Sequence, residues 1–315
     1  MLRRSIALAA ALMSTLALGS LLAAAPAGAF TSTCGTGHRH PLHYRHVIVI
    51  MYENHSLNQV IGNRNAPYMN SLAHSCGLAT NYHSTAHLSY PDYSAVTAGL
   101  NYPSRVGNNI FRQVNNSGRR WAVYSQSMPH PCQRTDAYPY ESGHNPATHY
   151  SLATCSSSSL ALGSPTSGPL DHALRSRTLP AYTWLVPDKC HDMHDVCYGN
   201  AVLTADNWTK AWITRIVHSH AYQAGGTAIF LTWDEGWKYN LNSLSGWDCY
   251  NHLTDNSCHV ATIVISPYTP HGARSSTFFS HYSLLKTTEQ MLGIGTYLNH
   301  AADPRSVGMR WPFHL

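Results

Sequence analysis

Residues 46–56 read HVIVIMYENHS, an apolar run that ends at Tyr52 and is followed at once by Glu53, Asn54 and His55. A short, continuous apolar run of this kind is typical of a strand that is buried on both faces of a parallel sheet. In open α/β sheets the ligand crevice lies beyond the carboxyl ends of the strands. We therefore expect the polar residues after this run to belong to a functional site.

Other apolar runs of strand length alternate with amphipathic segments along the chain, which indicates a βαβ organisation. The expected strands are Val47–Met51, Trp121–Tyr124, Tyr182–Val186, Ala228–Thr232 and Thr262–Ile265. Helical spacing of apolar residues is found in 65–75, 207–220 and 280–293, the last with Ser280 as a plausible N-cap and Gly293 as its stop. The Ser/Gly-rich stretch 151–168 is read as a surface loop. These patterns predict one α/β domain with a mainly parallel central sheet.

Residues 1–29 match a secretory signal peptide, because Arg3 and Arg4 precede a long uncharged apolar stretch that ends in small residues. Its removal would leave a single secreted domain, residues 30–315. No later segment is long and apolar enough to span a bilayer. Charged residues make up 11% of the chain and its basic residues do not cluster, which argues against nucleic-acid binding. The oligomeric state leaves no mark in the sequence.

The eight cysteines of an exported chain are expected to form disulfides. A cysteine-rich metal site is the weaker alternative, because the chain contains no C-x-x-C pair. Proximity along the chain favours four local bridges, Cys34–Cys76, Cys132–Cys155, Cys190–Cys197 and Cys249–Cys258.

Acidic side chains follow three of the apolar runs. These strand-end acids are Glu53, Asp188, Asp192, Asp234 and Glu235. For any one of them alone, a solvated loop acid is the more ordinary explanation. Carboxylates gathered in one partly dry crevice repel one another and lose hydration unless a cation lies among them. Three sets at equivalent strand ends therefore predict a metal site.

The segment HLSYPDYSAVTAGL (87–100) places Ser89 two residues before Pro91, which favours the first turn of a helix through Asp92 and Val96. The free N–H groups and the dipole at a helix N-terminus favour negative charge. With a cation bound to its oxygen, the serine hydroxyl can ionise and attack an electrophile. The ordinary alternative is that Ser89 only caps the helix. The chain has no G-x-S-x-G elbow, which argues against an α/β-hydrolase triad.

The 22 histidines make chance proximity to any site common. Three stand in patterned segments and are retained as candidates: His144 in GHNPATHY, His194 in CHDMHD and His281 in SHYSLL.

A set of motifs occurs in order from about His46 to Pro304: YENHSLNQVIGNRNAPYMNSLA, NYHSTAHLSYPDYSAVTAG, HNP, PDKCHDMHD, LTWDEG, and VISPYTPHG with SHYSLLKTTEQMLGI. This ordered set resembles the phosphoesterase family of secreted bacterial acid phosphatases and phospholipases C, which belongs to the alkaline phosphatase superfamily. The resemblance implies an α/β/α sandwich, alkaline phosphatase-like, and a hydrolase of phosphoric esters whose serine becomes phosphorylated.

The resemblance also implies roles for individual residues. The implied metal ligands are Glu53, Asn54, Ser89, Asp234 and Glu235. His194 and His281 would face the phosphoryl group or a second cation, with His144 close by and Asp188 and Asp192 as possible ligands of that second site. Many superfamily members carry Asp-His where this chain has Asp234-Glu235. An all-oxygen set suits Mg²⁺, Mn²⁺ or Ca²⁺ better than Zn²⁺.

The expected reaction is attack of Ser89 on a phosphomonoester, followed by hydrolysis of the phosphoserine by water. The substrate would be a small phosphate ester or a phospholipid headgroup. The runner-up is a phospholipase C-type phosphodiesterase with an apolar trench, for which the candidate lining residues are Trp237, Tyr239, Trp247, Tyr250 and the segment 138–140. Simple packing is the ordinary explanation of these aromatic residues. A third reading is a non-catalytic exported protein that sequesters metal.

Overall fold

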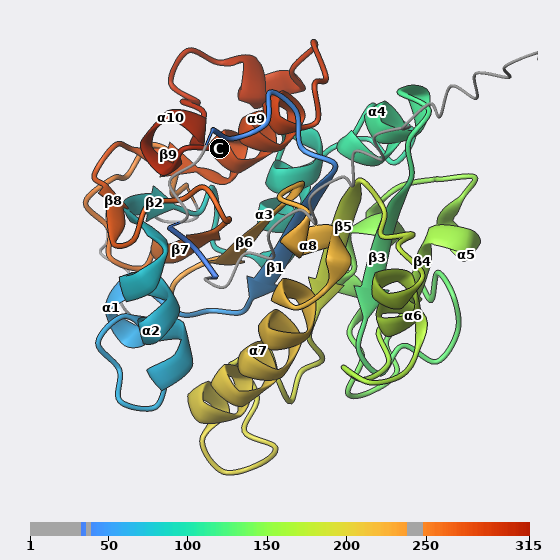
Figure 1. The fold of residues 1–315 in the computed structure, drawn as a ribbon, viewed down its shortest axis with the longest axis horizontal. Helices are drawn as coiled ribbons and strands as arrows, with labels where there is room; N and C mark the ends of the chain where they lie inside the picture. The colour runs from blue at the N-terminus through green and yellow to red at the C-terminus, as the bar shows by residue number, and fades with distance from the viewer. Residues whose placement is uncertain (1–32, 36–38, 238–247) are drawn as a thin grey trace, which may run out of the picture.

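The computed structural model describes residues 33–35, 39–237 and 248–315, and these form a nine-stranded sheet with helices on it (Figure 1). The strands are β1 (His46–Tyr52), β2 (Gly77–His83), β3 (Trp121–Ser125), β4 (Ser159–Ala161), β5 (Tyr182–Val186), β6 (Thr227–Trp233), β7 (His259–Ile265), β8 (Ala273–Ser275) and β9 (Phe279–Ser280). The α-helices are α1 (Leu57–Val60), α2 (Pro67–Ser75), α3 (Ser89–Ala98), α4 (Ile110–Asn116), α5 (Cys155–Ser158), α6 (Pro169–Arg175), α7 (Ala201–Val217), α8 (His220–Gln223), α9 (His281–Met291) and α10 (Arg310–Phe313). Short 3₁₀ turns include η1 (Ser142–His144), η2 (Pro146–His149) and η4 (Asn299–Ala302).

Strand β1 lies in the middle of the sheet, whose order is β4-β3-β5-β1-β6-β7-β2-β8 with β9 paired to β2. It runs parallel to β5 on one side and to β6 on the other. Residues 47–50 of β1 are fully buried, as expected for an apolar run covered on both faces. Among the described strands only β7 is antiparallel to both of its neighbours, β6 and β2. The prediction of an α/β/α sandwich with a mainly parallel sheet is confirmed.

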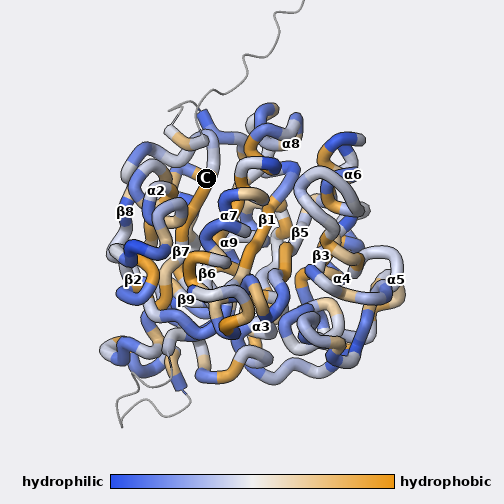
Figure 2. The backbone as a smooth tube through the Cα atoms, turned by 90° about the horizontal axis from the view of Figure 1, so that it is seen from below, coloured by the Kyte–Doolittle hydropathy of each residue, from blue (hydrophilic) through white to orange (hydrophobic). Residues whose placement is uncertain are grey.

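Two groups of helices cover the sheet. Helix α2 packs on α7, which contacts α8, and α8 contacts α6, whereas α3 packs on α9 and α4. Figure 2 places α2 and α8 on one side of the sheet and α3 on the other. Helix α3 is buried along its length from Pro91 to Ala98, where it packs against α9, α4 and the two 3₁₀ turns η1 and η2. It ends at Gly99, whose φ is +69° and where a Cβ would lie 2.4 Å from the Leu298 carbonyl oxygen.

All five expected strands and the three expected helices are present, with shifted ends. The helix expected at 207–220 begins at Ala201, because the Asn200 side chain caps it by accepting a hydrogen bond from the Leu203 N–H at 2.9 Å. The expectation of a surface loop at 151–168 is wrong in part. This stretch contains α5 and β4, and β4 is held at the edge of the sheet by parallel pairing with β3.

Four disulfides bridge Cys34–Cys76, Cys132–Cys155, Cys190–Cys197 and Cys249–Cys258. Each joins cysteines that are neighbours in sequence order, as proximity along the chain suggests. The expected signal peptide at 1–29 lies outside the described residues, as do Tyr239 and Trp247 of the suggested trench. Within the described part of the chain, no helix is long and apolar enough to cross a membrane.

Candidate active site

Three adjacent parallel strands deliver acidic loops to one edge of the sheet. Strand β1 is followed by Glu53, β6 by Asp234, and β5 by the loop that carries Asp192. The backbone ties these loops together, because the Glu53 N–H donates to the Asp192 carbonyl and the Asp234 N–H to the Tyr52 carbonyl, both at 2.9 Å. The convergence that the strand-end pattern predicts is therefore built by the order of the strands.

Ser89 is the first residue of α3 and is half-buried, and its hydroxyl points at the acids. The Ser89 Oγ–H donates to Glu53 Oε2 at 2.9 Å. One turn along the same helix, the Tyr93 hydroxyl donates to Glu53 Oε1 at 2.8 Å. Glu53 is 1% exposed, and these two hydrogen bonds fix its carboxyl against the helix that carries Ser89.

The carboxyl groups of Glu53, Asp192 and Asp234 form a buried cluster with unused oxygen atoms. Asp234 Oδ1 accepts hydrogen bonds from the N–H groups of Asn54 and Glu235, but Asp234 Oδ2 and Asp192 Oδ2 are buried without a hydrogen-bond partner. Burial, together with the nearby Asp192 charge, raises the pKa of Glu53 to about 8. Burial and the neighbouring acids also raise the pKa of Asp234 and of Asp192. Such a set of oxygens is suited to a divalent cation, which would favour the charged forms.

His144 in η1 lies inside this cluster. Its ring is stacked on the Tyr93 ring at 5.6 Å, its Nε2 is 3.4 Å from Glu53 Oε1, and its Nδ1 is 3.7 Å from Asp192 Oδ2. Burial lowers the pKa of His144 to about 4, so the imidazole is neutral at ordinary pH. The structure thus brings His144 to the acids, as the sequence suggests.

For the metal-free protein, we expect the free energy of unfolding to fall as the pH rises from about 6.5 to about 8. Folded Glu53 keeps its proton up to about pH 8, whereas the unfolded carboxyl loses it near its ordinary value of 4.5. The folded state then binds more protons, and each such carboxyl lowers the stability by up to about 1.4 kcal/mol per pH unit. The buried histidines His144 and His281 make the stability rise with pH, but only below pH 6.5, because there they are charged in the unfolded chain and neutral in the folded one.

Thermal unfolding with chelator at several pH values between these limits tests the expectation. A saturating divalent cation should flatten the slope, because it stabilises the ionised carboxylates. A melting temperature that rises with pH across this interval in chelator would contradict it.

A small pocket of about 140 Å³ opens at Ser89. Its lining residues are polar or charged: Glu53, Asn54, Ser89, Glu141, His144, Lys189, Asp192 and His194. At its rim the Lys189 ammonium lies 3.0 Å from Glu141 Oε2 and 3.7 Å from Asp195 Oδ2. His194 is held beside them, with its Nδ1 2.9 Å from Asp195 Oδ1. The volume and lining are suited to a phosphoryl group.

The rim residues Lys189 and Glu141 are not among those that the sequence suggests as site residues. They lie in loops without a periodic pattern, and their only signal is that they neighbour His194 and His144 in the chain.

Three suggested site residues are buried behind the pocket instead of lining it: Asp234, whose carboxyl belongs to the cluster described above, Glu235 and His281. The Glu235 carboxylate turns to His87, whose Nδ1 is 3.2 Å from Glu235 Oε2. His281 is fully buried, and its Nε2–H donates to the Asp234 carbonyl at 2.5 Å, while the Tyr82 hydroxyl lies 3.0 Å from its Nδ1. His281 therefore holds the Asp234 backbone in place, which differs from the expectation that it faces the phosphoryl group.

Asp188 also differs from the expectation of a second metal site. It accepts hydrogen bonds from the Ser127 hydroxyl at 2.6 Å and the Cys190 N–H at 3.1 Å, and it lies 2.7 Å from His191 Nδ1. These contacts use both carboxylate oxygens to fasten the loop after β5. Of the two acids suggested for that site, the structure places only Asp192 in the pocket.

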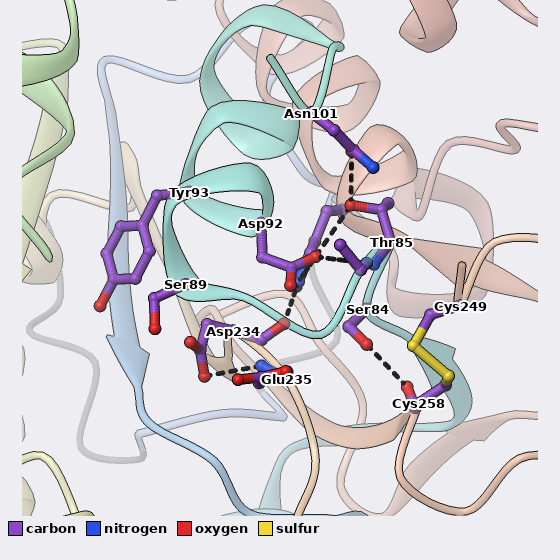
Figure 3. A network of polar contacts seen from close by, with 12 residues as sticks. Ser84, Thr85, Ser89, Asp92, Tyr93, Asn101, Asp234, Glu235, Cys249 and Cys258 are labelled. Atoms are coloured by element: carbon purple, nitrogen blue, oxygen red, sulfur yellow. Dashed lines mark hydrogen bonds and ion pairs between the residues drawn. A yellow bond between two sulfur atoms is a disulfide. The ribbon is translucent and has the colours of Figure 1, made fainter. Parts of the chain in front are cut away.

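Asp92 holds the loop that leads into α3, the helix that begins at Ser89 (Figure 3). Its Oδ1 accepts hydrogen bonds from the Thr85 N–H, the Thr85 hydroxyl and the Ala86 N–H at 2.7, 2.8 and 3.0 Å. Figure 3 shows Ser89, Asp92 and Tyr93 projecting from α3 close to Asp234. Burial, with Glu235 and Asp234 nearby, raises the pKa of Asp92 well above its ordinary value. Its role is to set the backbone path immediately before Ser89.

His87 Nε2 approaches the sulfur atoms of Cys249 and Cys258 at 3.2 and 3.4 Å. These sulfurs form a disulfide with each other and are not thiolates, so they are not suited to hold a metal ion. The carboxylate cluster at Ser89 is the better candidate for a cation.

Comparisons with known proteins agree with the sequence resemblance. The model of the Phosphoesterase family matches residues 63–295, which is more than half of the chain. The chain is 25% identical over 265 residues to a phosphatidylinositol-3-phosphatase of Mycobacterium tuberculosis, covering 80% of this chain and 78% of that protein. It is 23% identical over 267 residues to a probable acid phosphatase of Kluyveromyces lactis, covering 78% of this chain and 58% of that protein.

Among solved structures, the fold is similar to that of a protein in the alkaline phosphatase superfamily from Vibrio parahaemolyticus. The TM-score is 0.58 and the sequence identity is 10%, with 87% of this chain and 73% of that chain covered. At this identity the likeness concerns the fold alone, and it agrees with the expected alkaline phosphatase-like sandwich.

Proposed function

Because the chain belongs to the Phosphoesterase family, we propose that it hydrolyses phosphomonoesters through a phosphoserine formed on Ser89. The family, together with its phosphatase-named relatives, makes the chain a hydrolase of phosphoric esters. The observation that carries the finer proposal is the 2.9 Å hydrogen bond from the Ser89 hydroxyl to Glu53, inside a pocket lined by buried acids. Preference for monoesters is supported by the relatives, whose names are those of phosphatases.

A divalent cation fits among these acids. The residues that would hold it are Glu53, Asn54, Ser89 and Asp234, with Asp192 beside them. The two buried carboxylate oxygens that have no hydrogen-bond partner, Asp192 Oδ2 and Asp234 Oδ2, support this, and the all-oxygen set favours Mg²⁺, Mn²⁺ or Ca²⁺ over Zn²⁺. When bound, the cation would lower the pKa of the serine hydroxyl and stabilise charge on the phosphoryl oxygens. Glu235 adds negative charge nearby while its carboxylate stays with His87.

In the first step, Glu53, whose carboxyl a bound cation would keep ionised, takes the Ser89 hydroxyl proton at Oε2 as Ser89 Oγ attacks phosphorus on the side opposite the ester oxygen. The new Oγ–P bond forms and the bond from phosphorus to the ester oxygen breaks. His194, whose Nδ1 is occupied by Asp195, presents its other nitrogen to donate a proton to the departing alcohol. Lys189 places a positive charge at the rim, where the non-bridging oxygens carry negative charge.

In the second step, water attacks the phosphoserine while His194 takes one of its protons. Inorganic phosphate leaves, and Ser89 Oγ recovers its proton from Glu53. The chain thus returns to its starting protonation state. The N-terminus of α3, where free N–H groups face the site, favours the anionic phosphoryl group in both steps.

Acid-quenched turnover tests the covalent intermediate and the ester class together. We expect one phosphoryl group on the peptide that contains Ser89 after rapid mixing with p-nitrophenyl phosphate, detected by mass spectrometry. Turnover of bis-p-nitrophenyl phosphate and of phosphatidylcholine is measured in parallel to test the phospholipase C-type alternative. Faster turnover of either diester than of the monoester would overturn the monoester assignment. Metal binding without turnover of any ester would instead support the non-catalytic alternative.

We also propose that the protein acts outside the cytoplasm. The signal-peptide pattern of residues 1–29 and the four disulfides support export, since disulfides persist in oxidising compartments.

A further inference from the structure

Three aromatic rings form a row beside the nucleophile, and we call His149, Tyr90 and Tyr102 the ring row. Tyr90 directly follows Ser89 in the first turn of α3. The Tyr90 ring centroid lies 4.3 Å from that of His149 and 6.2 Å from that of Tyr102. Because successive helix residues point in different directions, Ser89 reaches Glu53 while Tyr90 turns to His149. The proposed catalytic hydroxyl and the aromatic surface are therefore carried by consecutive residues, Ser89 and Tyr90.

The inner end of the ring row is fixed and uncharged. His149 is buried, its Nε2–H donates to the Gly143 carbonyl at 2.8 Å, and the Ser94 hydroxyl donates to its Nδ1 at 3.2 Å. With both nitrogens engaged, the ring has one orientation. Burial lowers the pKa of His149 to about 4, so it is a neutral ring that supports Tyr90 by stacking.

The outer end of the ring row faces solvent. Tyr90 is 37% exposed and Tyr102 is 69% exposed, so both rings offer apolar surface to the surroundings. The backbone before Tyr102 is anchored, because the Asn101 side-chain oxygen accepts a hydrogen bond from the Tyr282 hydroxyl at 2.8 Å. Exposed aromatic surface on a fixed base beside a catalytic pocket is a feature that the packing of the core does not require.

The catalytic pocket leaves the alcohol portion of a substrate outside it. Its volume of about 140 Å³ and its charged lining are suited to the phosphoryl group and a cation. We propose that the ring row binds the alcohol portion when this contains a planar ring, so that aryl or nucleoside monophosphates are preferred. This inference rests on the proposed phosphomonoesterase function and specifies its substrate class.

The test compares Tyr102→Ala with the parent enzyme on p-nitrophenyl phosphate and on glycerol 3-phosphate. The ratio of the two kcat/KM values is used, because the intrinsic reactivity of each ester cancels when the variant is divided by the parent. We expect the variant to lower this aryl-over-glycerol ratio by roughly threefold to tenfold, mainly through the KM for the aryl ester. Tyr102→Phe should restore the ratio because it keeps the ring. Trp311→Ala is the control, since Trp311 is a 90% exposed aromatic residue on α10, which packs against the edge strand β8.

A ratio that changes by less than twofold in Tyr102→Ala would overturn the proposal. So would selective loss of activity on vesicles that contain a phosphatidylinositol monophosphate, because that result would assign the exposed rings to contact with a bilayer. Failure of the proposed function is recognised separately. In that case the parent enzyme itself turns over neither monoester, or the Ser89→Ala variant keeps its activity.

Discussion

Replacing Ser89 with alanine is expected to lower kcat for p-nitrophenyl phosphate by about a thousandfold or more, because the attacking oxygen is removed. The fold should survive the change. Glu53 keeps its hydrogen bond from Tyr93, and loss of the serine hydroxyl should alter the free energy of unfolding by about 1 kcal/mol or less. Steady-state kinetics together with thermal unfolding would measure both effects.

The matched control is Ser71→Ala on the exposed face of α2, which should keep the parental rate. The covalent intermediate provides a second readout, because Ser89→Ala should yield no phosphorylated peptide. A well-folded Ser89→Ala protein that retains more than about a tenth of the parental rate would show that another group attacks phosphorus.

The second large effect is expected at Asp234. In Asp234→Asn the Oδ1 atom still accepts the two backbone N–H bonds, but the buried Oδ2 becomes an NH₂ group that repels a cation. We expect the divalent-metal content of the purified protein to fall and kcat/KM to drop by about a hundredfold or more. Because a buried carboxyl is removed, the metal-free variant should be no less stable than the metal-free parent near pH 8.

Glu235→Gln is the informative comparison, because Glu235 is the next residue but turns its carboxylate to His87. We expect less than about a tenfold loss of kcat/KM for this variant, with metal content retained. Elemental analysis of both variants alongside the parent measures this difference. Equal loss of metal in both variants would place the Glu235 carboxylate among the metal ligands. An Asp234→Asn variant that keeps its full metal content and full activity would show that Asp234 does not bind the cation.

The positions of five strands are predictable from the sequence, because strands buried on both faces of a sheet appear in it as continuous apolar runs. That rule finds β1, β3, β5, β6 and β7, and it places Glu53 and Asp234 at the same edge of the sheet. It misses β2, whose sequence GLATNYH is too polar to stand out, β4, which has only three residues within a Ser-rich stretch, and β8 and β9, which have three and two residues. Short edge strands are defined by the partner they pair with, and local sequence does not contain that information.

The direction of individual side chains is less predictable. Asp234 and Glu235 are consecutive at a strand end, where neighbouring side chains point to opposite sides, so the Asp234 carboxyl joins the buried cluster beside Glu53 while the Glu235 carboxylate turns to His87. His281 stands in the segment SHYSLL, which resembles a family motif, but its ring is directed at a backbone carbonyl, and only tertiary packing decides this. The rim residues Lys189 and Glu141 meet across two loops that are far apart in sequence.

The disulfide between Cys190 and Cys197 encloses a loop that contains Asp192, His194 and Asp195. Two of these three residues, Asp192 and His194, line the pocket at Ser89, so part of the pocket wall is carried by this covalent ring. If the protein is exported as proposed, the ring would close only in the oxidising compartment, and the fully assembled pocket would then belong to the exported form and not to the newly made chain.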